Sequence, residues 1–552
     1  GEYNRVNRYF LTGVADIHLN SKFQNEVGPV GNATTISILQ AIALFIVVIA
    51  WINFINLSTA KSVERAREVG VRKVMGARKR ELVFQFFTEA VLINGMAVVL
   101  ALVFVLVGQP LFNLFVEKSL SLESIDIGRF GLLAILIFVL GTTLSGFYPA
   151  FVISSHQIIN ALKGKSKVDA GLYVRRGLIV FQLLFSSLLI MATLAINGQL
   201  KFMNNQAMGF DMEQVLILRG PTINPARAAD NLPNIERFKQ QVLMIPGVSS
   251  IGTSTVIPGQ GILRGLAISR VRESEADMKS IERVVTSDNF LSTMKVNFLA
   301  GKDFDREMKG YTPLILNVSA AKELGFLDPA DAIGQILYEF LREERKVVGV
   351  IEDYHHESLN RPIDAMYFVR NEAFDPFYAI RVNTREVGTT LARIEAQYKT
   401  SFPGNPTDHY FLDQFFASQY KKDRVNLKVF SAFALMAIIV ACLGLYGLSS
   451  FSALQRTKEV GVRKVLGASI PSLFMLLSKE VFLLVLLGFT LAMPIAWLSI
   501  ESWLNEFAYR MQVGALLFII PLLLILVITL LATGITILRV ATVNPVKSLS
   551  YE

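Results

Sequence analysis

The sequence predicts a polytopic α-helical membrane protein with a large external α/β domain, built from two copies of one membrane module. Only 18% of the 552 residues are charged and the mean hydropathy is +0.45, whereas a soluble globular chain carries about 25% charge. Seven uncharged stretches reach the length of about 20 residues that a membrane-spanning helix requires. One decapeptide motif also occurs twice in the chain.

The apolar stretches predict seven transmembrane helices in this chain. Each stretch is rich in Leu, Ile, Val and Phe, with scattered Gly and Pro of the kind that lipid-buried helices tolerate. A buried core helix of a soluble protein would explain one such stretch, but not seven. We place the hydrocarbon-embedded parts at residues 36–57, 90–112, 131–153, 177–197, 430–450, 481–500 and 515–537.

The distribution of basic residues predicts the orientation of these helices. All of the positive excess lies in segments 58–89, 156–176, 451–480 and 539–552, whose net charges are +4, +4, +3 and +1. The positive-inside rule places such loops in the cytoplasm. We therefore expect Gly1 outside, Glu552 inside, and residues 201–428 in one external domain. The pI near 9.4 then reflects membrane topology, and the lipid bilayer rather than nucleic acid is the expected partner.

The internal repeat is the most specific feature of the sequence. Glu68–Ala77 reads EVGVRKVMGA and Glu459–Ala468 reads EVGVRKVLGA, with nine of ten residues identical at an offset of 391. The same offset aligns Glu89 with Glu480, each at the entrance to the next predicted span. Because the second copy also has a span and an external domain before its motif, we expect a longer natural chain. One further span, the eighth, and most of another external domain would then precede Gly1.

The residues of the motif suggest a short, rigid surface element. Gly70 and Gly76 are expected to end helices and to bracket the five-residue piece Val71–Met75. Arg72 and Lys73 in this piece predict a cationic surface, while its apolar side chains can insert into a groove. A charge run that only orients the chain would explain the charge, but not why the order of residues is repeated.

The second copy carries the same element and shows where the following helix begins. Gly461, Arg463, Lys464 and Gly467 occupy the equivalent positions. Ser469 and Pro471 suit an N-cap and an early helical position. Residues 84–87 and 473–477 are expected to form apolar faces that lie in the membrane interface.

The two decapeptides resemble the signature E-[IV]-G-[IV]-R-[KR]-x-x-G-A of MacB/FtsX-like ABC-transporter permeases. Five further stretches are similar to the duplicated permeases common in Bacteroidetes-type genomes: IAWINFINLSTAKS (49–62), FYPAFVISS (147–155), RRGLIVFQLLFSS (175–187), GVIEDYHHESL (349–359) and ACLGLYGLSSFSALQRTKEVGVRKVLGAS (441–469). One departure is Gln157–Leu162, where the second half has the family's NPVKSL at 544–549. No role is assigned to that first-half segment.

The resemblance implies a non-catalytic permease subunit that transmits the ATP-driven motion of a separate ATPase to periplasmic domains, for export or extraction of a substrate. It implies two copies of an ABC ATPase as partners, which bind the ATP, and no cofactor in this chain. It also implies a periplasmic adaptor or substrate protein as a further partner, and the cell inner membrane as the location. The sequence contains no G-x-x-x-x-G-K-[ST] loop that would cradle a nucleotide phosphate. The expected ATPase-coupling residues are Glu68, Gly70, Arg72, Lys73, Gly76, Glu89, Glu459, Gly461, Arg463, Lys464, Gly467 and Glu480.

The resemblance and the spans together predict the domain organisation. The predicted parts are the end of a first periplasmic domain (1–35), a first FtsX-like module (36–155) with its coupling loop (58–89), a cytoplasmic linker (156–176), the helix that opens the second module (177–197), the periplasmic domain (198–428), the second module (429–538) with its coupling loop (451–480), and a cytoplasmic tail (539–552).

The external segment has the alternating patterns of a mixed α/β domain. The predicted strands are 215–218, 249–254, 283–287, 314–316, 347–351, 366–369 and 378–382, and the predicted helices are 234–244, 319–324 and 389–398. We expect two subdomains that meet near 290–310, and a stalk over 410–424 that leads into the fifth span. Residues 352–357 (EDYHHE) suggest a metal site only superficially, since adjacent His355 and His356 would point to opposite sides of a strand. No metal or catalytic site is predicted.

Other functions remain open at this stage. An FtsX-like permease that activates periplasmic cell-wall hydrolases would have the same sequence features. A secondary transporter normally buries ionisable residues in its spans, and none of Asp, Glu, Lys or Arg lies in the seven predicted cores. A membrane-anchored sensor or enzyme would need a constellation of reactive side chains, which the external segment lacks.

Overall fold

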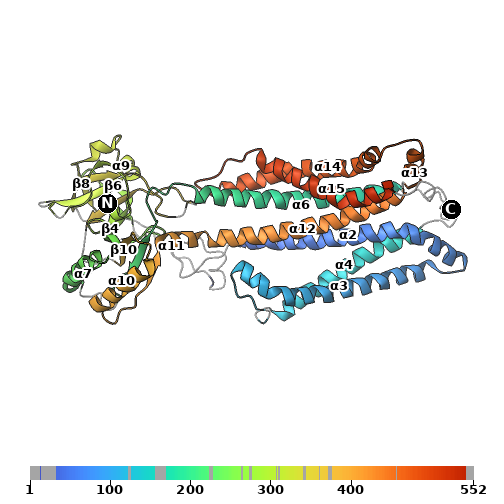
Figure 1. The fold of residues 1–552 in the computed structure, drawn as a ribbon, viewed down its shortest axis with the longest axis horizontal. Coiled ribbons are helices and arrows are strands. Elements are labelled where there is room, and N and C mark those ends of the chain that lie inside the picture. Colours follow the sequence, from blue (N-terminus) through green and yellow to red (C-terminus); the bar gives the residue numbers. More distant parts are fainter. Residues whose placement is uncertain are drawn as a thin grey trace, which may run out of the picture.

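The protein is elongated, with an α/β domain at one end and a bundle of long helices extending from it (Figure 1). The computed structural model describes residues 13, 33–121, 123, 126–155, 169–222, 228–262, 265–272, 277–305, 307–308, 311–339, 343–357, 359, 361–370, 376–455 and 457–542. Within this part of the chain, the seven predicted spans are confirmed as seven long apolar helices. They are α2 (Ala33–Val74), α3 (Lys79–Val116), α4 (Ile127–Ser155), α6 (Asp169–Asn204), α12 (Lys421–Gln455), α14 (Ile470–Leu504) and α15 (Leu516–Thr542).

These helices owe their length to their composition. Their apolar stretches run for 18 to 37 residues, and a helix is the element that satisfies its own backbone hydrogen bonds where no water is present. The large exposed side chains of α3 and α14 are almost all aliphatic or aromatic, as expected for surfaces that face lipid.

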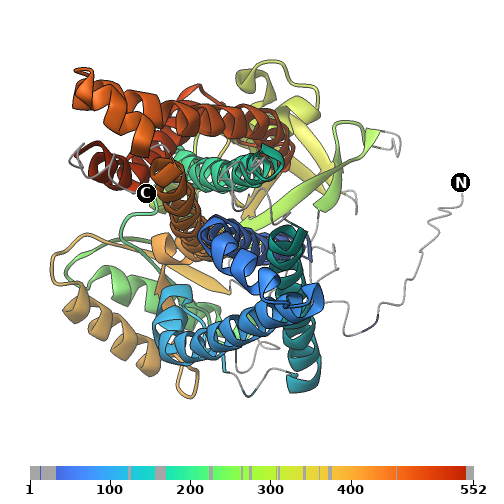
Figure 2. The ribbon, with the colours of Figure 1, turned by 90° about the vertical axis from the view of Figure 1, so that its right-hand side faces the viewer.

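The bundle consists of two sets of helices. In the first set, α3 packs on α4, and α4 packs on α2. In the second set, α6 contacts both α12 and α14, and α15 lies against α12 and α14. Seen along the bundle, the blue and cyan helices of the first set lie beside the green, orange and red helices of the second (Figure 2).

The two sets meet where α2 lies along α12, and this contact joins equivalent positions of the repeat. A Cβ atom on Gly444 would overlap Asn53 Oδ1, and residues 53 and 444 are separated by the repeat offset of 391. Equivalent positions of two copies contact each other only near the axis that relates the copies. The two modules are therefore arranged around a pseudo-twofold axis that passes close to Asn53 and Gly444.

Among its described residues, the α/β domain has eleven strands in one hydrogen-bonded network. They are β1 (Val215–Arg219), β2 (Val248–Ser254), β3 (Gly265–Ser269), β4 (Lys279–Thr286), β5 (Phe298–Gly301), β6 (Thr312–Asn317), β7 (Ile336–Glu339), β8 (Glu344–Ile351), β9 (Met366–Arg370), β10 (Phe377–Val382) and β11 (His409–Phe411). Strands β11, β1, β10 and β2 form an antiparallel sheet. Strands β4, β3, β7, β8, β6 and β9 form a closed ring, because β9 pairs in parallel with β4.

Two subdomains result from this topology. The sheet and the ring are joined where β2 meets β4, at Ser254 and Thr286, and the adjoining residues add backbone hydrogen bonds from Thr255 to Val285 and from Ser287 to Thr253. Helices α7 (Ala228–Leu243) and α10 (Val387–Ser401) cover the sheet through an aromatic core, while the short helix α9 (Val318–Glu323) packs on the ring. The chain passes between the subdomains at 254–265 and 370–377. Near 290–310, where the subdomains are expected to meet, Phe290, Met294 and Phe304 lie in a buried cluster that contains residues of both the sheet and the ring. The short helix α8 (Phe290–Thr293) in this segment packs against β2 and β10.

The seven predicted strands and three predicted helices of this domain all occur. The strands without a prediction are β3, β5, β7 and β11, which have three to five residues each. The predicted stalk consists of α11 (Leu412–Gln419) and the first turns of α12. The α/β domain is thus connected directly to the bundle through α6 and through α11 and α12.

Candidate coupling site

The first repeated motif forms the end of α2 and the turn into α3. Gly76 adopts a left-handed conformation with φ of 96°, and the Ala77 N–H donates to the Arg72 carbonyl at 2.9 Å. This six-to-one hydrogen bond around a left-handed Gly is the Schellman motif that ends many helices. The Arg78 N–H then donates to Glu81 Oε2 at 3.0 Å, which supports the start of α3.

The second motif forms the same turn after helix α13 (Thr457–Val465). Gly467 has φ of 94°, and the Ala468 N–H donates to the Arg463 carbonyl at 2.9 Å. The predicted N-cap is confirmed, because Ser469 precedes α14 and its hydroxyl accepts from the Ser472 N–H. The two copies therefore place Arg72 and Arg463 at the same position of the same helix-ending turn.

The predicted role of the other two motif glycines is wrong. Gly70 lies inside α2, and Gly461 lies inside α13, so neither ends a helix. An interior Gly costs only about 1 kcal/mol relative to Ala, and the Val, Arg and Lys residues that follow continue the helical hydrogen bonding. The repeated element is therefore the last turns of a helix rather than an isolated five-residue piece.

The turns present an apolar tip beside cationic side chains. Met75 is 82% exposed and the equivalent Leu466 is 80% exposed. Arg72 and Arg463 are also exposed.

Buried side chains beneath the turns hold them in place. Leu473 and Leu477 of α14 pack against Val460 of α13, and Leu82 occupies in α3 the position equivalent to Leu473. Leu82 and Leu473 are both almost fully buried. The residues predicted to be interfacial, 84–87 and 473–477, thus lie in the first turns of α3 and α14, and Leu473 and Leu477 attach the second turn to α14.

Polar contacts add to this anchoring. Arg72 Nη1 donates to Gln85 Oε1 at 2.8 Å, which connects the end of α2 to α3. Arg463 Nη2 pairs with Glu459 at 2.8 Å within α13. Glu480 of α14 pairs with Arg176 of α6, with Oε1 at 2.6 Å from Nη2 and 2.8 Å from Nε.

The remaining predicted residues are placed as follows. Glu89 lies in α3, nearly three turns into the helix, and Lys464 lies in the last turn of α13. The backbones of Glu68 and Lys73 belong to α2, while their side chains lie outside the described part of the structure. Arg176 and Gln85 were not predicted. The repeat offset identifies Glu480 in the sequence, but it does not identify Arg176 as its ion-pair partner.

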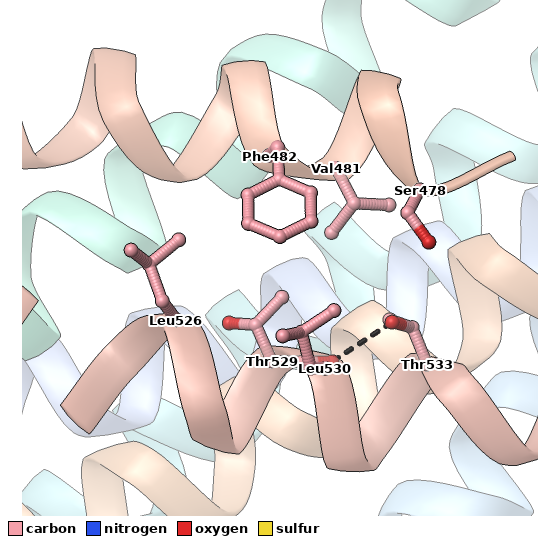
Figure 3. Close-up of a pocket in the computed structure, with 7 residues that line it drawn as sticks. All are labelled: Ser478, Val481, Phe482, Leu526, Thr529, Leu530 and Thr533. Carbon is pink, nitrogen blue, oxygen red and sulfur yellow. Dashed lines mark hydrogen bonds between the residues drawn. The ribbon is translucent and has the colours of Figure 1, made fainter. Parts of the chain in front are cut away.

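A small groove lies next to this ion pair, between α14 and α15. The groove is too narrow to hold a water molecule, and Thr533 Oγ1 donates to the Thr529 carbonyl at 2.8 Å along its wall (Figure 3). The lining residues are Ser478, Val481, Phe482, Leu526, Thr529, Leu530 and Thr533. Because this lining carries no charge, the groove is typical of loose helix packing rather than of a nucleotide site.

Two equivalent helix-ending turns, on long apolar helices and at the opposite end from an α/β domain, define a duplicated membrane protein. Residues 41–158 and 431–545 match the FtsX-like permease C-terminal family. The chain therefore contains two FtsX-like permease modules and is related to MacB. It is a multi-pass membrane protein.

Individual relatives match over short regions. The macrolide export ATP-binding/permease protein MacB 2 of Aeromonas hydrophila is 34% identical over 86 residues, which are 16% of this chain and 13% of that protein. MacB of Bdellovibrio bacteriovorus is 30% identical over 131 residues, which are 23% of this chain and 19% of that protein. The chain thus matches less than a fifth of the length of either relative.

Solved structures also show similarity. The periplasmic region of MacB from Actinobacillus actinomycetemcomitans is 9% identical, with a TM-score of 0.28, and the match covers 40% of this chain and 97% of that structure. The extracellular domain of the transporter YknZ from Gram-positive bacteria is 12% identical, with a TM-score of 0.26, over 36% of this chain and 99% of that structure.

Proposed function

We propose that this protein is the permease subunit of an ABC transporter of the MacB/FtsX type. ATP-driven motion of two separate ATPase subunits is transmitted through the two helix-ending turns to the α/β domain, which acts in export or extraction of a substrate. The observation that carries this proposal is the repeated turn. The same left-handed Gly, Arg and exposed apolar tip occur twice, on modules related by the axis near Asn53 and Gly444.

The location of the turns supports an ATPase at that end of the bundle. α13 and the α14 start lie at the end opposite the α/β domain (Figure 1). The predicted cytoplasmic segments with excess Lys and Arg include both turns. A soluble partner that hydrolyses ATP requires cytoplasmic docking, so the α/β domain lies in the periplasm and the helices cross the inner membrane.

Each ATPase subunit engages one turn in this proposal. The apolar tip inserts into a groove of the ATPase, and the adjacent Arg pairs with its acidic residues. Because Arg72 contacts Gln85 of α3, and Leu473 of α14 packs against Val460 of α13, a displacement of a turn also displaces the helix that follows it. The predicted domain organisation, with modules at 36–155 and 429–538, gives one docking site for each ATPase subunit.

Thiol labelling in intact cells tests the orientation. In a Cys442→Ser background, Met75→Cys and Leu466→Cys are expected to resist a membrane-impermeant maleimide, while Leu327→Cys in the α/β domain reacts. All three side chains are highly exposed, so accessibility within the fold does not distinguish them. Labelling at Met75→Cys and Leu466→Cys without permeabilisation contradicts the proposed docking site.

A further inference from the structure

The loop that follows β8 contacts the helix bundle, and the first residues of this loop attach it to the α/β domain. Asp353 accepts hydrogen bonds from the Ser319 N–H at 2.9 Å and the Ser319 hydroxyl at 2.8 Å, which ties the loop to the start of α9. The Tyr354 side chain is buried in the core of the domain. The structure thus places residues 352–357 in a loop rather than a strand, and their first part is fixed to the α/β domain.

The next residues of this loop leave the α/β domain and contact the bundle. The His355 N–H donates to the carbonyl of Met208, just beyond the end of α6, at 2.9 Å. The His355 ring meets the Tyr509 ring edge to face, with centroids 4.6 Å apart and an interplanar angle of 86°. Tyr509 lies in the connection between α14 and α15.

The connection that carries Tyr509 is held firmly to α6. Gln199 of α6 is buried, and its Nε2 donates to the Tyr509 carbonyl at 2.8 Å. Its Oε1 accepts from the Met511 N–H at 2.9 Å. A side-chain amide that pairs with both backbone groups in this way fixes the connection much as a neighbouring strand would. Tyr509 therefore moves with the outer ends of α6, α14 and α15.

A surrounding apolar cluster packs against this contact. Met203, Met208, Leu359, Phe416 and Tyr420 are buried together, with Phe507 and Tyr509 packed against them. The Leu359 N–H donates to the Tyr420 hydroxyl at 3.1 Å, so the same loop also contacts the start of α12. Burial lowers the pKa of His355, which keeps the imidazole neutral and suited to an aromatic contact at neutral pH.

We propose that His355 and Tyr509 form an outer joint that passes movement of α14 and α15 to the α/β domain. This proposal rests on the proposed function, because it assumes that ATPase motion reaches α14. Each side of the joint is rigid, through Asp353 and Tyr354 on one side and Gln199 on the other. A shift of α14 driven at the Gly467 turn therefore moves Tyr509, and the His355 loop follows. His355 and Tyr509 are positioning residues in this mechanism.

A distance measurement on the permease–ATPase complex tests the joint. Spin labels at Leu327→Cys in the α/β domain and Leu120→Cys in the α3–α4 connection, with Cys442→Ser, report movement of the domain against the first module. Wild type is expected to show a change in distance when a non-hydrolysable ATP analogue is added. The labels report two populations, one with the nucleotide-free distance and one with the nucleotide-bound distance. In the presence of the analogue, Tyr509→Ala and His355→Ala should each lower the ratio of the nucleotide-bound to the nucleotide-free population by about 2- to 30-fold, the effect of disrupting a coupling path.

Three comparisons separate the outcomes. Tyr509→Phe keeps the ring and should retain the change in distance, and Tyr311→Ala removes an exposed aromatic side chain elsewhere in the domain and should have no effect. ATPase activity should stay close to wild type in every variant, because the joint lies far from the docking turns. A full nucleotide-dependent change in both Tyr509→Ala and His355→Ala overturns the joint. No change in the wild-type complex overturns the proposed function itself.

Discussion

The ion pair between Arg176 and Glu480 should stabilise the second module measurably. It joins the start of α6 to α14, close to the docking turn, through two contacts of 2.6 and 2.8 Å to one carboxylate oxygen. The side chains are 38% and 24% exposed. The energy of the pair should therefore exceed the roughly 0.2–1 kcal/mol of an exposed ion pair and approach the roughly 1.5–3 kcal/mol of a hydrogen bond to a charged group. We expect a coupling energy of about 1–2 kcal/mol for the pair.

A double-mutant cycle measures this energy. The free energy of unfolding in detergent is compared for wild type, Arg176→Gln, Glu480→Gln and the double variant. Each single substitution should destabilise the protein, and the second should cost little once the first has been made. The charge exchange Arg176→Glu with Glu480→Arg should recover part of the loss. Additive effects of the two single substitutions would show that the pair does not hold α6 to α14.

Three further predictions concern the module axis, the α/β domain and the docking turn. Gly444→Ala should overlap Asn53 and lower the free energy of unfolding by about 1–3 kcal/mol. Gly108→Ala, whose added Cβ meets no atom within 4 Å, should leave the free energy of unfolding unchanged. Burial and nearby carboxylates raise the pKa of Glu282 to about 7. Its folded form therefore retains a proton that the unfolded chain loses, and stability should decline as the pH rises from about 4.5 to 7. After allowance for solvent screening the decline is about 1–2 kcal/mol, and unfolding measured across this range should show no such decline in Glu282→Gln. Gly467→Ala should destabilise the left-handed turn by about 1 kcal/mol, and the melting temperature of the purified protein should fall accordingly.

The features predicted best from the sequence are those fixed by local physical requirements. An apolar stretch of about 20 residues has few alternatives to a membrane helix, and all seven were found. Ser469 was recognised as an N-cap because its hydroxyl sits just before Pro471 and an apolar run. The same local reasoning failed at Gly70 and Gly461, since a Gly ends a helix only where the chain turns into the left-handed conformation.

Contacts between distant segments could not be predicted. Arg176 and Glu480 are 304 residues apart, and no pattern in either segment indicates the other. His355 was noticed only as part of a weak metal-like motif, because its ring partner lies in a short connection more than a hundred residues later. The repeat is the exception. Because each copy contains the same residues, the sequence alone identifies two equivalent turns. The axis between the modules can be located only from the contact between Asn53 and Gly444 in the structure.

The central claim, that the two turns dock the ATPase subunits, has one direct test. The ATPase is co-purified with wild type, Arg72→Ala, Arg463→Ala and the double variant, and its recovery is quantified against the permease. Truncating a charged docking contact typically costs about 2–5 kcal/mol, so the double variant should lose the ATPase, while each single variant retains one site and a milder defect. Membrane insertion should persist, since segment 58–89 keeps seven of its eight basic residues. Wild-type recovery of the ATPase by the double variant would contradict the account, and the motif would then only orient the chain in the membrane.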